Sequence, residues 1–146
     1  MNKYMKGFVR SYIATALWSS SDTKTTEDGD EYYDELDSMV ANDQATLSYS
    51  MTKQCIHDCQ RFIILIRKYF KKEEADYILN REASDLDYLA PHEFWLTRNG
   101  HGAGFRDGDW DGTELGDFGD DLTWICKNEF KPVDLYVGDD NRIYLI

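Results

Sequence analysis

The residues whose types and spacing are best suited to chemistry lie between His92 and Phe105, in the segment HEFWLTRNGHGAGF. Glycine occupies positions 100, 102 and 104 of this segment. Because glycine is used where φ is positive or where another segment of backbone comes close, this spacing predicts a sharp turn. We expect this turn to be a site, and its candidate residues are Arg98, Asn99 and His101.

A histidine beside glycine in a tight turn is a residue that general acid–base catalysis or metal binding could use. A metal-assisted enzyme built on His101 and the aspartates that follow it is therefore one functional alternative. The chain contains no HExxH, GxSxG or paired CxxC motif and no phosphate-binding glycine loop. We expect His101 to hydrogen-bond within the turn, and we expect no catalytic residues.

The segment DGDWDG, which begins at Asp107, is the second candidate for chemistry. Asp107, Asp109 and Asp111 alternate and Gly112 follows them, as in the first half of an EF-hand calcium loop. The second half does not fit, because Phe118 stands where a bidentate glutamate is needed. We expect a solvated acidic loop without a cofactor, and Ca²⁺ held by Asp107, Asp109 and Asp111 is the alternative.

The net charge of −12 is the strongest global feature of the chain. A surface this negative repels nucleic acid and anionic membranes, and it attracts proteins with basic surfaces. Acidic residues gather at 27–37 and at 107–121. Together they would imitate the charge of DNA if the fold placed both clusters on one face, which the sequence does not decide.

Aromatic residues stand among these charges and would add contact area to a protein interface. They include Tyr32, Tyr33, Trp110 and Phe118. The candidate partner-binding residues are therefore Glu27, Asp28, Asp30, Glu31, Tyr32, Tyr33, Asp34, Glu35, Asp109, Trp110 and Asp111. The alternative is that both segments are solvated loops that serve solubility.

Apolar residues at helical spacing predict the elements that position these segments. We expect a helix from about Met5 that ends near Trp18, followed by an acidic loop at about 19–41 with at most one helical turn at its end. A long helix capped by Asn42 or Asp43 should bury a stripe from Leu47 to Phe70. Shorter helices are predicted near 73–79 and 117–130.

Two antiparallel hairpins complete the predicted fold. One has strands at 93–98 and 103–106, and the other joins VDLYV to RIYLI through a GDDN turn. We therefore expect an α+β fold in a single domain, residues 1–146, with a small antiparallel sheet packed on three to four helices.

Cysteine usage and hydropathy indicate a cytoplasmic protein. Cys55 and Cys59 lie on one face of the predicted long helix, while His57 between them points elsewhere, so core thiols are favoured over a zinc site. Three cysteines without a signal peptide indicate a reducing compartment. The longest apolar run, Phe62 to Ile66, is too short to span a membrane.

Four sequence blocks also resemble one group of proteins. They are TALWSSSD at 15–22, the D-C-x-x-F pattern at Asp58, Cys59 and Phe62, the FWLTRNGHGAGF block, and VDLYVGDD at 133–140. As a set they resemble small acidic proteins of tailed bacteriophages that carry no functional assignment. This chain departs from the pattern at Arg106, where tryptophan is expected, and in its extra aspartates Asp109 and Asp111.

The resemblance transfers no catalytic residue and implies a phage protein that acts in the host cytoplasm. Small acidic phage proteins often bind and disable a host enzyme. The implied function is non-enzymatic inhibition of a host protein that handles nucleic acid, by acidic DNA mimicry. Such targets include a defence nuclease, RNA polymerase or a DNA-associated protein.

Overall fold

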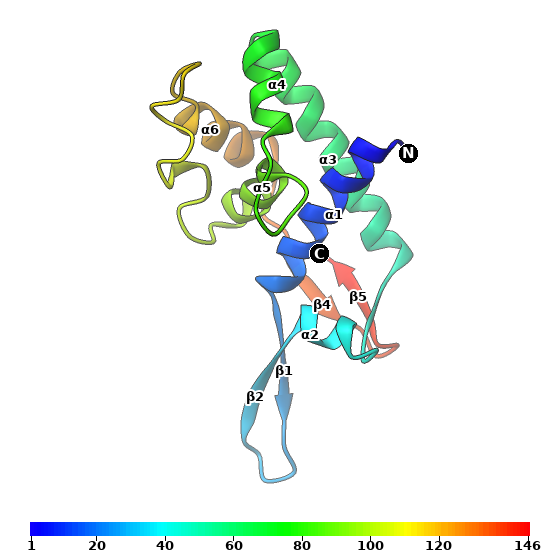
Figure 1. Cartoon of the computed structure of the whole chain (residues 1–146). Coiled ribbons are helices and arrows are strands. Elements are labelled where there is room, and N and C mark those ends of the chain that lie inside the picture. The colour runs from blue at the N-terminus through cyan, green and yellow to red at the C-terminus, as the bar shows by residue number, and fades with distance from the viewer.

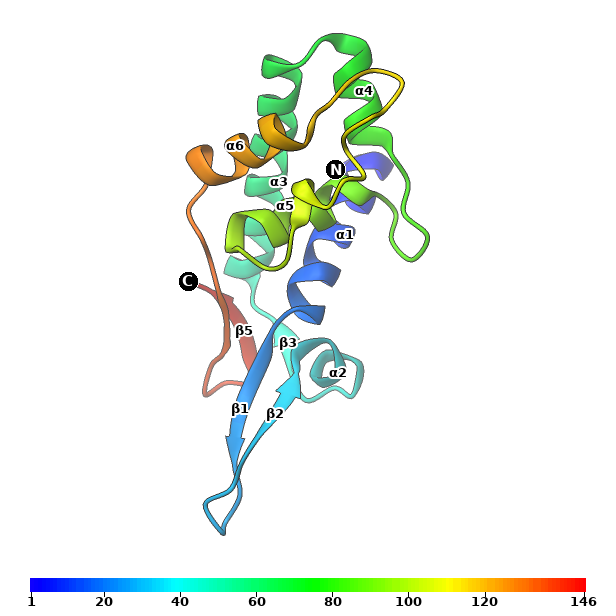
Figure 2. The same cartoon turned by 90° about the vertical axis from the view of Figure 1, so that its left-hand side faces the viewer.

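The computed structural model describes residues 1–146 (Figures 1 and 2). Six α-helices, one short 3₁₀ helix and five strands follow one another along the chain. They are α1 (Lys3–Trp18), β1 (Ser21–Thr25), β2 (Glu31–Glu35), α2 (Leu36–Ala41), β3 (Thr46–Leu47), α3 (Tyr49–Tyr69), α4 (Lys72–Asn80), α5 (Leu89–Asn99), η1 (Gly104–Arg106), α6 (Gly119–Glu129), β4 (Leu135–Val137) and β5 (Arg142–Leu145). With 53% of its residues helical and 14% in strands, the fold is α+β, as predicted.

Helices α1, α3, α4 and α6 form where the apolar spacing predicted helices. Helix α3 is the longest, with 21 residues, but its predicted cap is wrong. The Ser48 side chain accepts a hydrogen bond from the Met51 amide and caps α3, and the strand β3 separates this cap from Asn42 and Asp43. Asp43 has a positive φ of 58° just after α2, so it lies beyond the end of that helix.

Helix α5 replaces the hairpin predicted at 93–98 and 103–106, which is therefore wrong. Pro91 occupies the first turn, where its missing amide proton is not needed. Gly100, with φ of +69°, ends the helix, and the amides of Gly100 and His101 donate to the carbonyl oxygens of Thr97 and Leu96. This is a Schellman cap. The second predicted strand is the helical turn η1.

The C-terminal hairpin is confirmed and forms most of a three-stranded sheet with strand order β3-β5-β4. Strands β4 and β5 are antiparallel and pair Leu135 with Leu145 and Val137 with Ile143. Strand β3 pairs with β5 in parallel, so the sheet is mixed rather than purely antiparallel. Helix α3 packs against β5, and Leu135 and Ile143 enter the core.

The segment predicted as an acidic loop at 19–41 is instead a hairpin of β1 and β2 followed by helix α2. Figures 1 and 2 show this hairpin extending away from the helices as a separate two-stranded sheet. No residue of either strand is buried. The loop prediction failed because the strands bury no apolar face, and an apolar face is the feature that identifies a strand in a sequence.

One hydrophobic cluster of 29 buried residues lies among the helices and the three-stranded sheet. It includes Cys55, Cys59 and Cys126, which are all free thiols, so the prediction of core thiols is confirmed. Burial raises the pKa of Cys55 to about 12, which keeps that thiol protonated and unreactive. None of the helices combines the length and the apolar character that a membrane span requires.

Candidate functional site

Helix α5, at the centre of the block that the sequence analysis singled out, is a structural hub. Arg98 is only 4% exposed. Its guanidinium donates to Asp58 of α3 at 2.8 Å, to the Tyr12 hydroxyl of α1 at 2.9 Å, and to the Lys131 carbonyl at 2.6 and 3.0 Å. A buried charge needs this degree of pairing, so Arg98 holds three segments together and is not presented to a ligand.

The four sequence blocks of the phage resemblance meet on this helix. Trp95 donates its indole N–H to Ser19 at 2.8 Å, and His92 shares a hydrogen bond of 2.8 Å with Thr15. The rings of Phe62 and Phe94 stack with centroids 4.4 Å apart. The side chain of Asn99 accepts a hydrogen bond of 2.7 Å from the Val133 amide. Packing around α5 therefore brings these four blocks into contact.

The glycine-rich turn after α5 folds back onto the helix. Gly104 has φ of +56°, and a Cβ at this position would lie 2.1 Å from Thr97 Oγ1. Thr97 Oγ1 also accepts a hydrogen bond from the Phe105 amide, and Phe105 is fully buried. Two of the three candidate residues, Arg98 and Asn99, therefore act within the fold, and only His101 is exposed.

His101 lies away from the aspartates with which an enzyme was hypothesised. It lines a shallow surface pocket together with Asn99, Pro132, Asp134 and Ile146, on the side of the C-terminal strand. It is not among the residues that gather near Asp107 and Asp109. The tertiary structure thus does not assemble the catalytic set that combined His101 with Asp107, Asp109 and Asp111.

The DGDWDG segment does not form the ligand set that its spacing suggested. Asp111 turns away, and its Oδ1 accepts a hydrogen bond of 3.0 Å from the Gly119 amide at the start of α6. Trp110 is fully buried against Phe105, and Phe118 is also buried. The calcium alternative that grouped Asp111 with Asp107 and Asp109 therefore does not match the structure. The prediction that Trp110 and Phe118 would contact a partner is wrong, because both side chains are buried.

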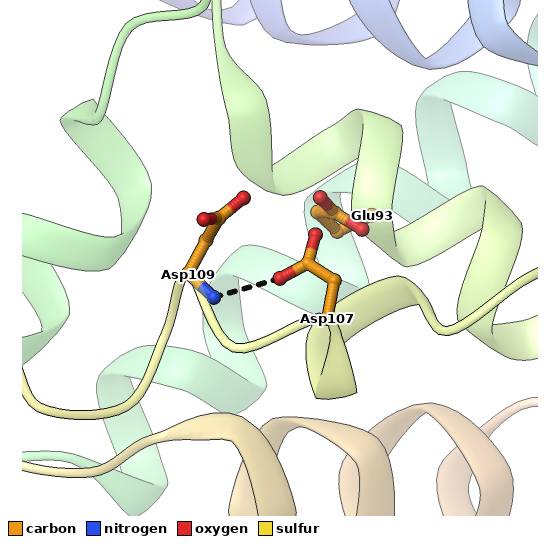
Figure 3. Close-up of side chains that lie close together, drawn as sticks. All are labelled: Glu93, Asp107 and Asp109. Atoms are coloured by element: carbon orange, nitrogen blue, oxygen red, sulfur yellow. Dashed lines mark hydrogen bonds between the residues drawn. The ribbon is translucent and has the colours of Figure 1, made fainter.

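A different acidic cluster forms instead, from Glu93 of α5 with Asp107 and Asp109. One carboxylate oxygen from each of the three residues lies within 4.8 Å of the other two. Figure 3 shows the three side chains directed toward a common space, and the dashed line marks the bond from the Asp109 amide to Asp107 Oδ1, at 2.8 Å. The sequence analysis missed Glu93 because it lies 14 positions before Asp107 and because helix α5 was not predicted.

Burial and charge act together on Glu93, which is 4% exposed. Burial first, and then the negative charge of Asp107, raises the pKa of Glu93 to about 8. Arg81 opposes this shift only weakly. Its guanidinium donates to the backbone carbonyl of Asp109 and lies 4.8 Å from the Trp110 ring centroid. Three converging carboxylates therefore share one space with no cation directly paired to them.

The β1–β2 hairpin is the second candidate site, and it concentrates charge. Residues 21–35 contain seven carboxylates and one lysine, and so carry half of the net charge of −12. The lysine, Lys24, is paired with Asp22 at 2.9 Å, which raises its pKa. Glu27, Asp28 and Asp30 occupy the exposed turn at the tip. The charge therefore extends over the whole hairpin.

Both faces of the hairpin carry exposed tyrosine among the acidic residues. Successive side chains of a strand point to opposite faces, so Tyr33 shares one face with Glu31 and Glu35, while Tyr32 and Asp34 lie on the other. Tyr33 is 68% exposed and Tyr32 is 46% exposed. Tyrosine is one of the residue types that contribute most to protein interfaces, and both of these side chains are accessible.

The two acidic clusters of the sequence do not share a face. In both views the hairpin extends from one end of the molecule, and the loop that contains Asp107 and Asp109 lies toward the opposite end, near α4 and α6 (Figures 1 and 2). The continuous negative stripe that the DNA-mimic hypothesis required across both clusters is therefore not formed.

Comparison with known proteins adds no relative from which a function could be transferred. The chain matches no protein-family model, no curated protein and no solved structure. The resemblance to small acidic phage proteins stays a prediction from the sequence blocks.

Proposed function

We propose that this chain is a non-enzymatic phage protein of the host cytoplasm that binds a host protein through the acidic β1–β2 hairpin. The target would have a basic surface that normally binds nucleic acid. The hairpin would occupy that surface and so inhibit the target. The observation that carries the proposal is the placement of half of the net charge on an element that contributes nothing to the hydrophobic core.

Energetic considerations support a binding role for this hairpin. An isolated two-stranded hairpin is marginally stable in water, and here Asp22 lies directly opposite Asp34, a like-charge pair that destabilises the sheet. The hairpin therefore adds little to folding stability. A basic partner surface would relieve this repulsion, and the exposed Tyr32 and Tyr33 would supply apolar contact area.

The proposal is narrower than mimicry by the whole acidic surface. The binding residues are those of the hairpin and its tip, Glu27, Asp28, Asp30, Glu31, Tyr32, Tyr33, Asp34 and Glu35. Trp110 is excluded by its burial, and the loop that contains Asp109 and Asp111 lies toward the opposite end of the molecule from the hairpin (Figures 1 and 2). The candidate targets remain a defence nuclease, RNA polymerase or a DNA-associated protein.

The test compares two variants of equal net charge. The hairpin variant carries Glu27→Gln, Asp28→Asn, Asp30→Asn and Glu31→Gln. The matched control carries Glu82→Gln, Asp85→Asn, Glu114→Gln and Asp121→Asn, four exposed carboxylates outside the hairpin. Tagged wild-type protein and both variants are used to capture proteins from lysates of uninfected and infected bacteria, and each captured protein is purified for affinity measurements at low and at physiological salt.

We expect one nucleic-acid-binding protein to be retained by the wild type and by the control. The hairpin variant should bind it at least about tenfold more weakly, duplex DNA should compete, and affinity should fall with added salt. A captured protein that binds all three chains equally, or that DNA does not displace, would contradict the proposal. Failure to retain any stoichiometric partner from either lysate would contradict it as well.

A further inference from the structure

We propose that Glu93, Asp107 and Asp109 form a binding site for one hard divalent cation, with calcium as the best fit. The site is independent of the hairpin and lies toward the opposite end of the molecule. It also differs from the EF-hand interpretation of DGDWDG, because it uses a glutamate from helix α5 and leaves Asp111 out.

The buried side chain of Glu93 is the observation that points to a ligand. Glu93 is only 4% exposed, and the one side chain with which it shares a hydrogen bond is another acid, Asp107. The Glu93 side chain is directed at two other carboxylates (Figure 3). A buried carboxylate normally needs a group that balances its charge, and the side chains that converge on Glu93 are acids that can share only a proton with it. A divalent cation between the three groups would balance their charge.

No basic side chain takes that place. None of the eight ion pairs of the structure involves Glu93, Asp107 or Asp109. Two neighbouring arginines are engaged elsewhere. Arg81 donates to the backbone carbonyl of Asp109 beside the Trp110 ring, and Arg106 pairs with Asp120. The space between the three carboxylates is thus open to a cation from solution.

The fold holds the two loop aspartates in place. Phe105 and Trp110 are fully buried on either side of the loop, with ring centroids 5.2 Å apart. The Phe118 amide donates to the Trp110 carbonyl at 2.8 Å, which closes the loop at its far end. A site whose ligands are already positioned loses less conformational entropy when it binds an ion.

The donor set decides the class of cation. All three ligands are carboxylate oxygens, which suit calcium, magnesium or manganese and disfavour zinc and copper, which prefer nitrogen or sulfur. Calcium binds oxygens at about 2.3–2.6 Å, so two ligands on opposite sides of one ion lie about 4.6–5.2 Å apart. The three oxygens, each within 4.8 Å of the other two, are close enough for one calcium ion to contact all of them. Calcium also tolerates irregular coordination, whereas magnesium requires a nearly ideal octahedron. Water or backbone carbonyls would complete the coordination.

The test uses calcium titrated into metal-free protein, followed by calorimetry and thermal unfolding. Wild-type protein should bind one Ca²⁺ per chain, and free calcium at about 100 times Kd should raise the folding equilibrium constant about a hundredfold. Glu93→Gln preserves the shape of the buried side chain, and Asp109→Asn changes an exposed one. Each variant should weaken calcium binding at least about tenfold.

Asp111→Asn is the matched control, because Asp111 belongs to the same DGDWDG segment but bonds Gly119 instead. It should bind calcium as tightly as the wild type. Equal weakening by Asp111→Asn and by Glu93→Gln would overturn the proposed ligand set. Absence of saturable calcium binding at millimolar concentration, or tighter binding of zinc than of calcium, would overturn the proposal itself.

Discussion

The α5 hub and the β1–β2 hairpin differ in how the character of their sequence relates to their exposure in the structure. The hub lies at the centre of the chain's most distinctive block, which contains histidine, arginine and three glycines. Its polar side chains nevertheless bond to other parts of the same molecule. The hairpin is an undistinguished acidic stretch, yet it is the element most open to another molecule. The comparison teaches that a dense local motif can reflect the demands of packing, whereas the charge of the hairpin has no role in packing and is free for the binding proposed above.

The physical reason for this difference is burial. Arg98 and Asp58 lie in the interior, where each polar group must be paired and each glycine conformation is fixed by its neighbours. The hairpin charges lie in water, where like charges are tolerated and side chains gain little by pairing with one another. Substitutions in the two regions should therefore affect stability and binding in opposite ways.

The largest expected effect is that of Arg98→Met. It leaves the buried carboxylate of Asp58 without its cation, and removal of one partner of a buried pair costs about 3–5 kcal/mol of unfolding free energy. Arg10→Met is the control, because Arg10 pairs with Asp87 on the surface. Its substitution should lower the unfolding free energy by about 1 kcal/mol or less. Chemical denaturation measures both. Similar losses for the two variants would contradict the role assigned to the hub.

An intermediate effect is expected for Gly104→Ala. The added Cβ would collide with Thr97 Oγ1 at a residue with positive φ, and overpacking of this kind costs about 1–3 kcal/mol. Gly102→Ala offers a matched control, since Gly102 also has positive φ, +65°, but no atom lies within 4 Å of the place that its added Cβ would occupy. The difference between the two denaturation midpoints measures the cost of the close contact between the added Cβ and Thr97 Oγ1. If both variants lose the same stability, the positive φ alone explains why glycine occupies these positions, and the contact with Thr97 adds nothing.

The smallest effect on stability is expected in the hairpin. The hairpin variant, with Glu27, Asp28, Asp30 and Glu31 neutralised, should change the free energy of unfolding by less than about 0.5 kcal/mol while it weakens partner binding. The same denaturation experiment provides the comparison with the hub. A loss of more than about 1 kcal/mol, beyond what surface substitutions usually cost, would show that the hairpin supports the fold. It would also remove the argument that the charge of the hairpin is reserved for binding.

Much of the helical framework follows from the sequence alone. Helices α1, α3, α4 and α6 each present one apolar face to the core, and this produces the three-and-four spacing that predicts a helix. The C-terminal hairpin is likewise predicted by alternation on either side of its GDDN turn. Local periodicity is sufficient in these elements because each has one buried side and one exposed side.

Helix α5 escaped prediction because it is buried on most of its circumference. Seven of its 11 residues are buried, and they include Glu93, Thr97 and Arg98 as well as the aromatic pair. A short, uniformly buried helix lacks the stripe that distinguishes it from a buried strand. Pro91 in the first turn and Gly100 after the last residue were the signals that could have identified it.

The sequence by itself determined the acidity of this protein, its α+β class and its reduced core thiols. These properties follow from composition and from contacts between near neighbours in the chain. Only the tertiary structure decided that Arg98 faces Asp58, that Glu93 meets Asp107 and Asp109, and that the hairpin stands apart from them. Such contacts depend on how whole helices pack against one another. A local sequence pattern does not specify which distant side chains will come together when they do.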